Sequence, residues 1–151
     1  MFEFASLEYM KEVQRRSNAD QKYRDLSKEE TASYLFILEP EPEKGVTKRF
    51  IIGYIVVRGE IVDVWVDEPR KTDFVISGKY GVWVDILLGK LGVTRAFLMR
   101  KLKVRGNFLK LMKYQKSTER WLEILRTIPT RFHGEYEKFN IEGKEYESGS
   151  L

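Results

Sequence analysis

The side chains that could do acid–base or nucleophilic chemistry are few in this chain. His133 is the only histidine and there is no cysteine, so a Cys–His pair is impossible and a Ser-His-Asp triad would have to recruit His133. Asp63 and Asp67 form the clearest carboxylate pair. At i and i+4 on one predicted strand they lie about 13 Å apart, too far to share a proton or a metal ion. We therefore expect no enzyme, no catalytic residue, no metal site and no cofactor.

Residues 96–107, AFLMRKLKVRGN, instead combine basic and apolar side chains. The basic side chains in this stretch are Arg100, Lys101, Lys103 and Arg105. No acidic residue occurs between Asp85 and Glu119, whereas this interval holds nine basic residues: Lys90, Arg95, Arg100, Lys101, Lys103, Arg105, Lys110, Lys113 and Lys116. A local positive field of this kind favours anionic partners.

The basic residues of 96–107 have three possible roles: nucleic-acid binding, docking to an anionic membrane, lipid head group or CoA phosphate, or simple solvation of a strand. Nucleic-acid binding would require aromatic residues interleaved with the charges on an exposed face, or a known motif. The alternation of this stretch instead points Leu102 and Val104 into the core. We expect no nucleic-acid partner, and the other two roles remain open.

The bulk composition is that of one globular domain. The chain has 151 residues, of which 42% are hydrophobic, enough to fill one core. No apolar run approaches the roughly 20 residues that span a bilayer, and acids stand where a signal peptide needs basic residues. Together with the absence of cysteine, these two features predict a cytoplasmic protein.

We expect one domain over residues 1–128 and a polar, acidic tail over 129–151, mobile or loosely docked. Scarce Asn and Gln lean toward a thermophilic source.

Hydrophobic periodicity predicts the order of the elements. Helical spacing covers 6–16, with Ser6 as a cap, and 17–30 is a second short helix or an irregular linker. Alternation predicts strands at 32–40, 48–57, 60–68 and 71–77, with Arg58-Gly59 as a hairpin loop. Helices follow at 79–89 and 92–100, the latter with Thr94 as a possible cap. A strand at 101–106 leads to a long helix at 107–127 that begins at Asn107. The fold class is α+β: a mainly antiparallel sheet of about five strands, with helices covering one face.

The strand at 60–68 raises a separate question. Its alternation directs Val62, Val64 and Val66 to one side of the sheet and the acids with Trp65 to the other. A large aromatic on the wet side suggests a cover, from the N-terminal helix or from a second subunit in a homodimer. A partly exposed Trp65 is the other possibility.

With the elements in this order, residues 76–115 resemble the sterol carrier protein 2 (SCP-2) family. The resemblance rests on Gly89-Lys90, on Ala96-Phe97 and on a Lys-Leu-Lys strand that ends in Gly106-Asn107, with family-like spacing. The family usually has a glycine where this chain has Arg100, and a proline where it has Val93. The chain resembles a free-standing carrier.

The resemblance implies a carrier that binds a lipid in an apolar tunnel between sheet and helices. The ligand would be a fatty acid, an acyl-CoA, an isoprenoid or a sterol-like lipid, with a transient contact to an anionic membrane or CoA. The alternative is an interaction or dimerisation module with a filled core, acting as an accessory subunit of a lipid-related enzyme. The candidate ligand-binding residues are Trp83, Ile86, Leu87, Phe97, Leu98, Leu102, Phe108, Leu109 and Met112.

Overall fold

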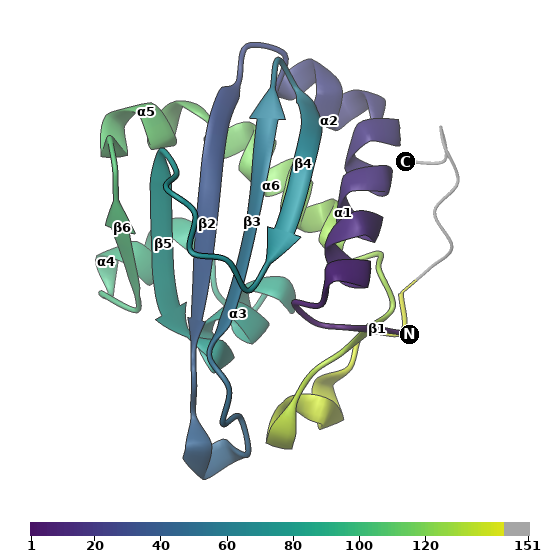
Figure 1. Ribbon diagram of the computed structural model, residues 1–151, viewed down its shortest axis with the longest axis vertical. Coiled ribbons are helices and arrows are strands. Elements are labelled where there is room, and N and C mark those ends of the chain that lie inside the picture. Colours follow the sequence, from purple (N-terminus) through teal and green to yellow (C-terminus); the bar gives the residue numbers. More distant parts are fainter. Residues whose placement is uncertain (144–151) are drawn as a thin grey trace.

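The computed structural model describes residues 1–143, and its centre is a five-stranded sheet (Figure 1). The strands are β2 (Thr31–Glu39), β3 (Phe50–Val57), β4 (Glu60–Val66), β5 (Phe74–Lys79) and β6 (Leu102–Arg105). Their spatial order is β4-β3-β2-β5-β6, and only β2 and β5 run parallel. The predicted α+β class with a mainly antiparallel sheet is confirmed.

Helices cover one face of this sheet and lie along both of its edges. They are α1 (Leu7–Ala19), α2 (Gln21–Leu26), α3 (Tyr80–Leu87), α4 (Val93–Leu98), α5 (Phe108–Lys113) and α6 (Gln115–Leu125), with 3₁₀ turns η1 (Pro42–Lys44) and η2 (Gly134–Phe139). In Figure 1, α6 crosses behind the sheet, α1 runs along the edge at β4, and α4 and α5 lie at the opposite edge beside β6.

The helix starts follow local capping chemistry. Ser6 and Asn107 cap α1 and α5, since their side-chain oxygens accept hydrogen bonds from backbone N–H groups three residues later, as expected. Thr94 does not cap α4, which begins after Gly92 without a side-chain cap. The predicted helix at 107–127 breaks at Tyr114, where ψ is 14°. Apolar residues recur at helical spacing in both α5 and α6, so the hydrophobic periodicity of the sequence does not reveal the break at Tyr114.

The β3–β4 hairpin turns at the predicted residues. Arg58 and Gly59 have φ of 48° and 79°, the two positive values that a type I′ turn requires. The register of the pair then shifts by one residue, so that Ile61 and Val64 face inward while Val62 is 47% exposed. The prediction that Val62 shares the inward side is therefore wrong, because a bulge inverts the alternation.

Edge strand β4 is covered by polar side chains of α1. Asn18 accepts a hydrogen bond from the Ile61 N–H at 2.8 Å, and both Asn18 and Gln14 donate to the Ile61 carbonyl at 2.9 Å. These contacts satisfy the backbone groups that a bare edge would offer to another chain.

Trp65 is buried on the outer face by its own chain. The indole packs over Gly53, where any side chain would collide with it, and is only 4% exposed. Its Nε1 donates to the Glu68 carbonyl at 2.9 Å, and the Arg70 guanidinium lies 4.3 Å from the ring centroid. Of the two alternatives, a covered and a partly exposed Trp65, the structure shows the covered one, but the cover comes from the loop after β4 and not from the N-terminal helix or a second subunit that the sequence suggested.

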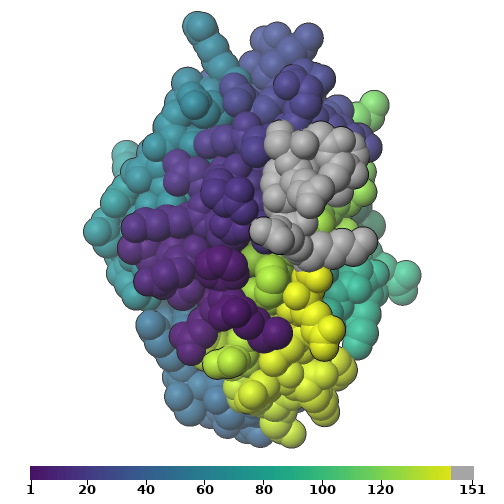
Figure 2. Space-filling model, turned by 90° about the vertical axis from the view of Figure 1, so that its right-hand side faces the viewer, coloured from purple at the N-terminus to yellow at the C-terminus, as the bar shows by residue number. Residues whose placement is uncertain are grey.

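The segment after residue 128 packs against the domain as far as the structure describes it. β7 (Thr130–Arg131) pairs in parallel with β1 (Phe2–Glu3), and Phe132 is 1% exposed, edge-on to the ring of Phe4. Figure 2 shows this yellow segment directly beside the purple N-terminal segment. The predicted loose tail is thus wrong for 129–143, because its few apolar residues are all used in packing. Residues 144–151 lie outside the described part.

Arg100 provides a test of backbone strain at the end of α4. Its φ is 59°, and the N–H groups of Arg100 and Lys101 bond to the carbonyls of Phe97 and Ala96, the pattern of a Schellman cap. A side chain in this conformation costs about 1–2 kcal/mol. We predict that Arg100→Gly unfolds at a higher urea midpoint than Arg100→Ala, corresponding to a free energy of unfolding that is about 1 kcal/mol larger. Equal midpoints would show that the strain is absent.

Candidate functional site

A cavity of about 840 Å³ lies between the sheet and helices α3 to α6. Its floor is formed by inward-facing strand side chains: Tyr34, Phe36, Tyr54, Ile76 and Leu102. Its walls come mainly from Trp83, Ile86, Leu91, Val93, Phe97, Leu111, Met112, Thr118, Trp121 and Leu122. The volume falls within the range of about 300–1,000 Å³ that small-molecule sites occupy.

Stacked aromatic rings give the cavity a rigid floor. Tyr34 stacks on Tyr54 with ring centroids 4.7 Å apart, and Phe36 stacks on Trp121 at 5.9 Å. Trp83 stands edge-on to Phe36 at 5.5 Å, and its Nε1 donates to two backbone carbonyls of the sheet. Offset stacking and edge-to-face contact are the preferred geometries of aromatic pairs. The rings therefore support one another and form an apolar surface.

A buried carboxyl lies behind this floor. Glu30, 3% exposed, accepts hydrogen bonds from the Tyr34 hydroxyl at 2.6 Å and the Ser117 hydroxyl at 2.7 Å. Burial raises the pKa of Glu30, although the two hydrogen bonds act in the opposite direction. Burial also raises the pKa of Tyr34, so its hydroxyl stays protonated as a donor. This group fixes the ring of Tyr34 and ties α6 to β2.

A buried ion pair holds α6 against α2. Arg120 donates from Nε and Nη2 to the two oxygens of Asp20, both at 2.8 Å, and each side chain is less than one-tenth exposed. The same carboxylate caps α2 by accepting the N–H of Tyr23. The bidentate geometry sets the position of α6 as well as contributing energy.

Arg126 anchors the other end of α6. Its guanidinium donates to the Leu87 carbonyl at 3.0 Å and to the Ile86 carbonyl at 2.9 Å, at the C-terminal end of α3. A cation is favourable at this end of a helix, where carbonyls are left without intrahelical partners. Arg126 also lines the cavity, so the wall itself contains a link between α3 and the end of α6.

The rim of the cavity is polar. It carries the exposed residues Thr94 and Arg95 on α4 and Gln115, Glu119 and Glu123 on α6. The Gln115 amide lies 3.4 Å from the Thr94 hydroxyl, its hydrogen-bond acceptor, and so connects the two helices. An elongated amphipathic molecule could place its apolar part on the aromatic floor and its polar end at this rim.

Five of the nine candidate ligand-binding residues line the cavity: Trp83, Ile86, Phe97, Leu102 and Met112. Leu87 lines a neighbouring void of about 40 Å³ beside Met10. Leu98, Phe108 and Leu109 are 80%, 47% and 77% exposed, so the prediction that they face the cavity is wrong. Helices α4 and α5 have six residues each, with apolar residues on more than one side, and the sequence does not reveal which of these sides is covered.

The sequence-based list omitted the aromatic floor. Tyr34, Phe36 and Tyr54 lie on inward-facing positions of β2 and β3, and Trp121 lies on the buried side of α6. The predicted strands at 32–40 and 48–57 and the predicted helix at 107–127 contain these residues. No feature of the sequence indicates that the space between these residues and helices α3 to α6 is left unfilled.

The other chemistry-bearing residues, Asp63, Asp67 and His133, do not line the cavity. Asp63 pairs with Arg70 at 2.8 Å and Asp67 with Lys48 at 3.5 Å, both on the surface. The His133 ring packs against Phe50. Within residues 1–143 no group of His, Asp or Glu side chains could hold a metal ion. None of the helices in this part combines the length and apolar character needed to cross a bilayer.

The basic residues lie on the outside, as the alternation predicted. Arg100, Lys101, Lys103 and Arg105 are all exposed, whereas Leu102 between them is 3% exposed. Strand β6 forms a sheet edge, so these cations flank the cavity without entering it.

Comparison with known proteins relates this architecture to lipid carriers. The model of the SCP-2 sterol transfer family matches residues 10–119. A crystal structure of a sterol carrier protein 2 superposes with a TM-score of 0.75 at 19% identity, over 83% of this chain and 98% of that one. No curated protein matches the chain in sequence.

Two further solved structures show the same fold. A Thermus thermophilus protein described as possibly a sterol carrier protein gives a TM-score of 0.73 at 19% identity, over 82% of this chain and 87% of its own. The apo form of Yarrowia lipolytica sterol carrier protein 2 gives 0.53 at 19% identity, with coverages of 80% and 91%. At these identities the likeness establishes the fold.

Glu30→Gln tests the buried carboxyl. The folded state favours protonated Glu30, so its contribution to stability is greatest below the ordinary pKa of 4.5 and is lost as pH rises toward the raised pKa. We predict that the free energy of unfolding of wild type, minus that of Glu30→Gln, falls as pH increases from 4.5. Urea titrations at several pH values measure this difference. A difference that is constant or rises with pH would contradict the assignment.

Arg120→Met tests the ion pair that holds α6. The Asp20 carboxylate would lose its bidentate guanidinium inside the protein, and we predict a loss of about 3 kcal/mol in urea unfolding. The matched control is Arg15→Met, at a surface pair with Glu12, which should cost under about 1 kcal/mol. Adding Asp20→Asn to Arg120→Met should recover part of the loss. Equal costs for the two arginines would mean that the buried pair does not hold α6.

Proposed function

Because this chain belongs to the SCP-2 sterol transfer family, we propose that its cavity binds the apolar part of a lipid and that the protein carries that lipid. The single observation that carries the proposal is the cavity of about 840 Å³ over the aromatic floor. The solved structures of the same fold are described as sterol carrier proteins, which supports a carrier role.

The energetics of an open apolar layer support a bound occupant. The cavity opens to solvent at its polar rim, so it need not stay dry. An apolar ligand that displaces water from the walls would gain about 25 cal/mol per Å² of apolar surface removed from water. Water or a ligand must fill the space, and water gains little from aromatic walls.

The chemistry of the walls favours an apolar chain or ring system with a small polar end. Each methylene transferred from water contributes about 0.8 kcal/mol, or roughly fourfold in affinity. A fatty acid, an acyl-CoA, an isoprenoid or a sterol-like lipid fits this description. Arg95 and Gln115 at the rim could bind a carboxylate, and the cations beyond Arg95 could bind the phosphates of CoA.

We do not propose catalysis or a dimerisation module. The surface carboxylates Asp63 and Asp67 are engaged with cations of the surface, which argues against acid–base use. The dimerisation alternative depended on an outer face that needs a partner at Trp65, and the loop carrying Arg70 already covers that ring. These observations favour a carrier over both alternatives.

Thr118→Trp tests ligand binding in the cavity. Thr118 lines the wall on α6, and an indole there would occupy the space of the ligand. We predict at least a tenfold loss of affinity for palmitate and palmitoyl-CoA, measured by displacement of a fluorescent fatty acid. The matched control is Thr47→Trp, at an exposed threonine that does not line the cavity, which should bind like wild type.

The outcome separates cavity binding from surface adsorption. Wild-type affinity should also rise by up to about fourfold per added methylene until the chain fills the cavity. Equal affinity of Thr118→Trp and Thr47→Trp would place any bound lipid elsewhere. Failure of palmitate, palmitoyl-CoA, a sterol and a polyprenyl lipid to bind wild type would overturn the carrier proposal.

A further inference from the structure

We propose that the protein docks on anionic bilayers through the outer sides of α4 and α5, with Leu98, Met99, Phe108 and Leu109 as apolar anchors. This inference rests on the proposed carrier function, because a carrier must exchange its lipid with a membrane. The bilayer is the partner that matches both the apolar and the charged character of this surface, which we name the α4–α5 tip. We define the tip as these four anchors.

The anchors are exposed to an unusual degree. Leu98 and Leu109 are 80% and 77% exposed, and Met99 and Phe108 are each 47% exposed. Single exposed apolar side chains are normal, but these four occur as two pairs of sequence neighbours, Leu98-Met99 at the end of α4 and Phe108-Leu109 at the start of α5. The remaining large apolar side chains that are exposed in residues 1–143 lie apart from this tip, on other elements: Met1, Leu26, Val57 and Val62.

A ring contact joins the two helices of the tip to the cavity. Phe97 of α4 meets Phe108 of α5 edge-on, with centroids 6.0 Å apart, and Phe97 also lines the cavity. Leu98 and Leu109 each follow one of these two rings in the sequence. A membrane contact at the tip would therefore place the bilayer next to the cavity wall, where lipid has a short path to the aromatic floor.

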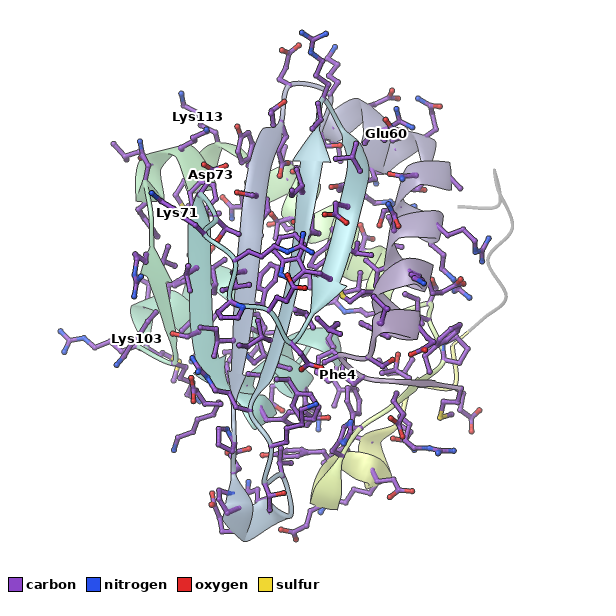
Figure 3. All side chains as sticks on the ribbon, in the orientation of Figure 1. Phe4, Glu60, Lys71, Asp73, Lys103 and Lys113 are labelled. Atoms are coloured by element: carbon purple, nitrogen blue, oxygen red, sulfur yellow. The ribbon has the colours of Figure 1, made fainter. Side chains whose placement is uncertain are left out.

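The charge around the tip favours an anionic surface. Nine basic residues occur between Asp85 and Glu119 with no acid among them. None of the nine forms an ion pair with a carboxylate of residues 1–143. Figure 3 shows Lys103 on β6 and Lys113 on α5 extending away from the body of the molecule, on the side where α4 and α5 lie.

The nearby acids suggest how the protein would sit on the membrane. Glu119 and Glu123 lie on the α6 side of the cavity rim, and Asp73, beside Gly106 at the start of α5, accepts hydrogen bonds from Ser33. An anionic surface would thus attract the side with α4, β6 and α5 and repel the α6 rim. A second copy of the chain is a poorer occupant, because two such basic surfaces repel each other.

Vesicle flotation tests the docking. Wild type should bind vesicles of phosphatidylcholine with phosphatidylglycerol, and should bind vesicles of phosphatidylcholine alone much more weakly. Leu98→Ser/Leu109→Ser should lower binding at least tenfold, because both anchors lose their apolar surface. Lys101→Gln/Lys103→Gln should lower it about fivefold per charge, the equivalent of about 1 kcal/mol each, with an effect that shrinks in high salt.

Matched variants away from the tip control for general effects. Val62→Ser removes an apolar side chain that is 47% exposed on β4, and Lys11→Gln/Lys22→Gln removes two exposed charges from α1 and α2. Both should bind vesicles like wild type. Equal binding by the tip variants and these controls would overturn the proposal. So would a dimer, measured by light scattering, that Leu98→Ser/Leu109→Ser abolishes.

Ligand affinity without vesicles separates this proposal from the carrier function. All four variants should bind palmitate in solution like wild type, because none of the changed residues lines the cavity. If wild type binds palmitate normally but does not bind vesicles, the docking proposal is refuted and the carrier proposal is not. Vesicle binding without any ligand binding would refute the carrier function on which the docking rests.

Discussion

The cavity depends on helix α6 being held at a fixed distance from the sheet. Trp121 of α6 already stacks on Phe36 and Tyr54, and hydrophobic burial alone would draw the rest of the helix onto the sheet, because unfilled apolar space is costly. Buried polar contacts oppose such a collapse: Arg120 binds Asp20 of α2, Ser117 binds Glu30 before β2, and Arg126 binds the end of α3. Each contact fixes both distance and direction, so moving α6 inward would break hydrogen bonds, and those of Asp20 and Glu30 are buried away from water.

The aromatic floor complements these anchors from the other side. Tyr34, Tyr54 and Trp121 support one another by stacking, and the Tyr34 hydroxyl is fixed by the same Glu30 that holds Ser117. The buried Glu30 carboxyl therefore links the aromatic floor to helix α6. The result is a layer that can accept a guest without repacking, which suits a carrier that must load and unload repeatedly.

The sequence predicts the elements that local rules determine. The strand alternation, the Arg58-Gly59 turn and the caps at Ser6 and Asn107 follow from neighbours a few residues apart. The pair of Asp20 and Arg120 joins residues that are 100 positions apart, and no local pattern reveals it. The cavity could be anticipated only through the family resemblance, because an open volume leaves the same apolar periodicity as a filled core.

The two short helices α4 and α5 account both for the wrong prediction that Leu98 and Leu109 face the cavity and for the proposal that this surface docks on membranes. Their apolar residues were expected to face the lipid, yet Leu98 and Leu109 face solvent. A helix of six residues that is apolar on both sides can line a cavity with one side and contact a membrane with the other. This arrangement would let one element serve both binding and exchange.

The four methionines permit the most direct test of lipid binding in the cavity. With ¹³C-methyl methionine and a fatty acid that carries a nitroxide near its tail, bound lipid should broaden the methyl signal of Met112, which lines the cavity. Met1, at the exposed N-terminus, should keep its signal. If the lipid binds and the signal of Met112 remains as sharp as that of Met1, the lipid does not occupy the cavity and the account is wrong.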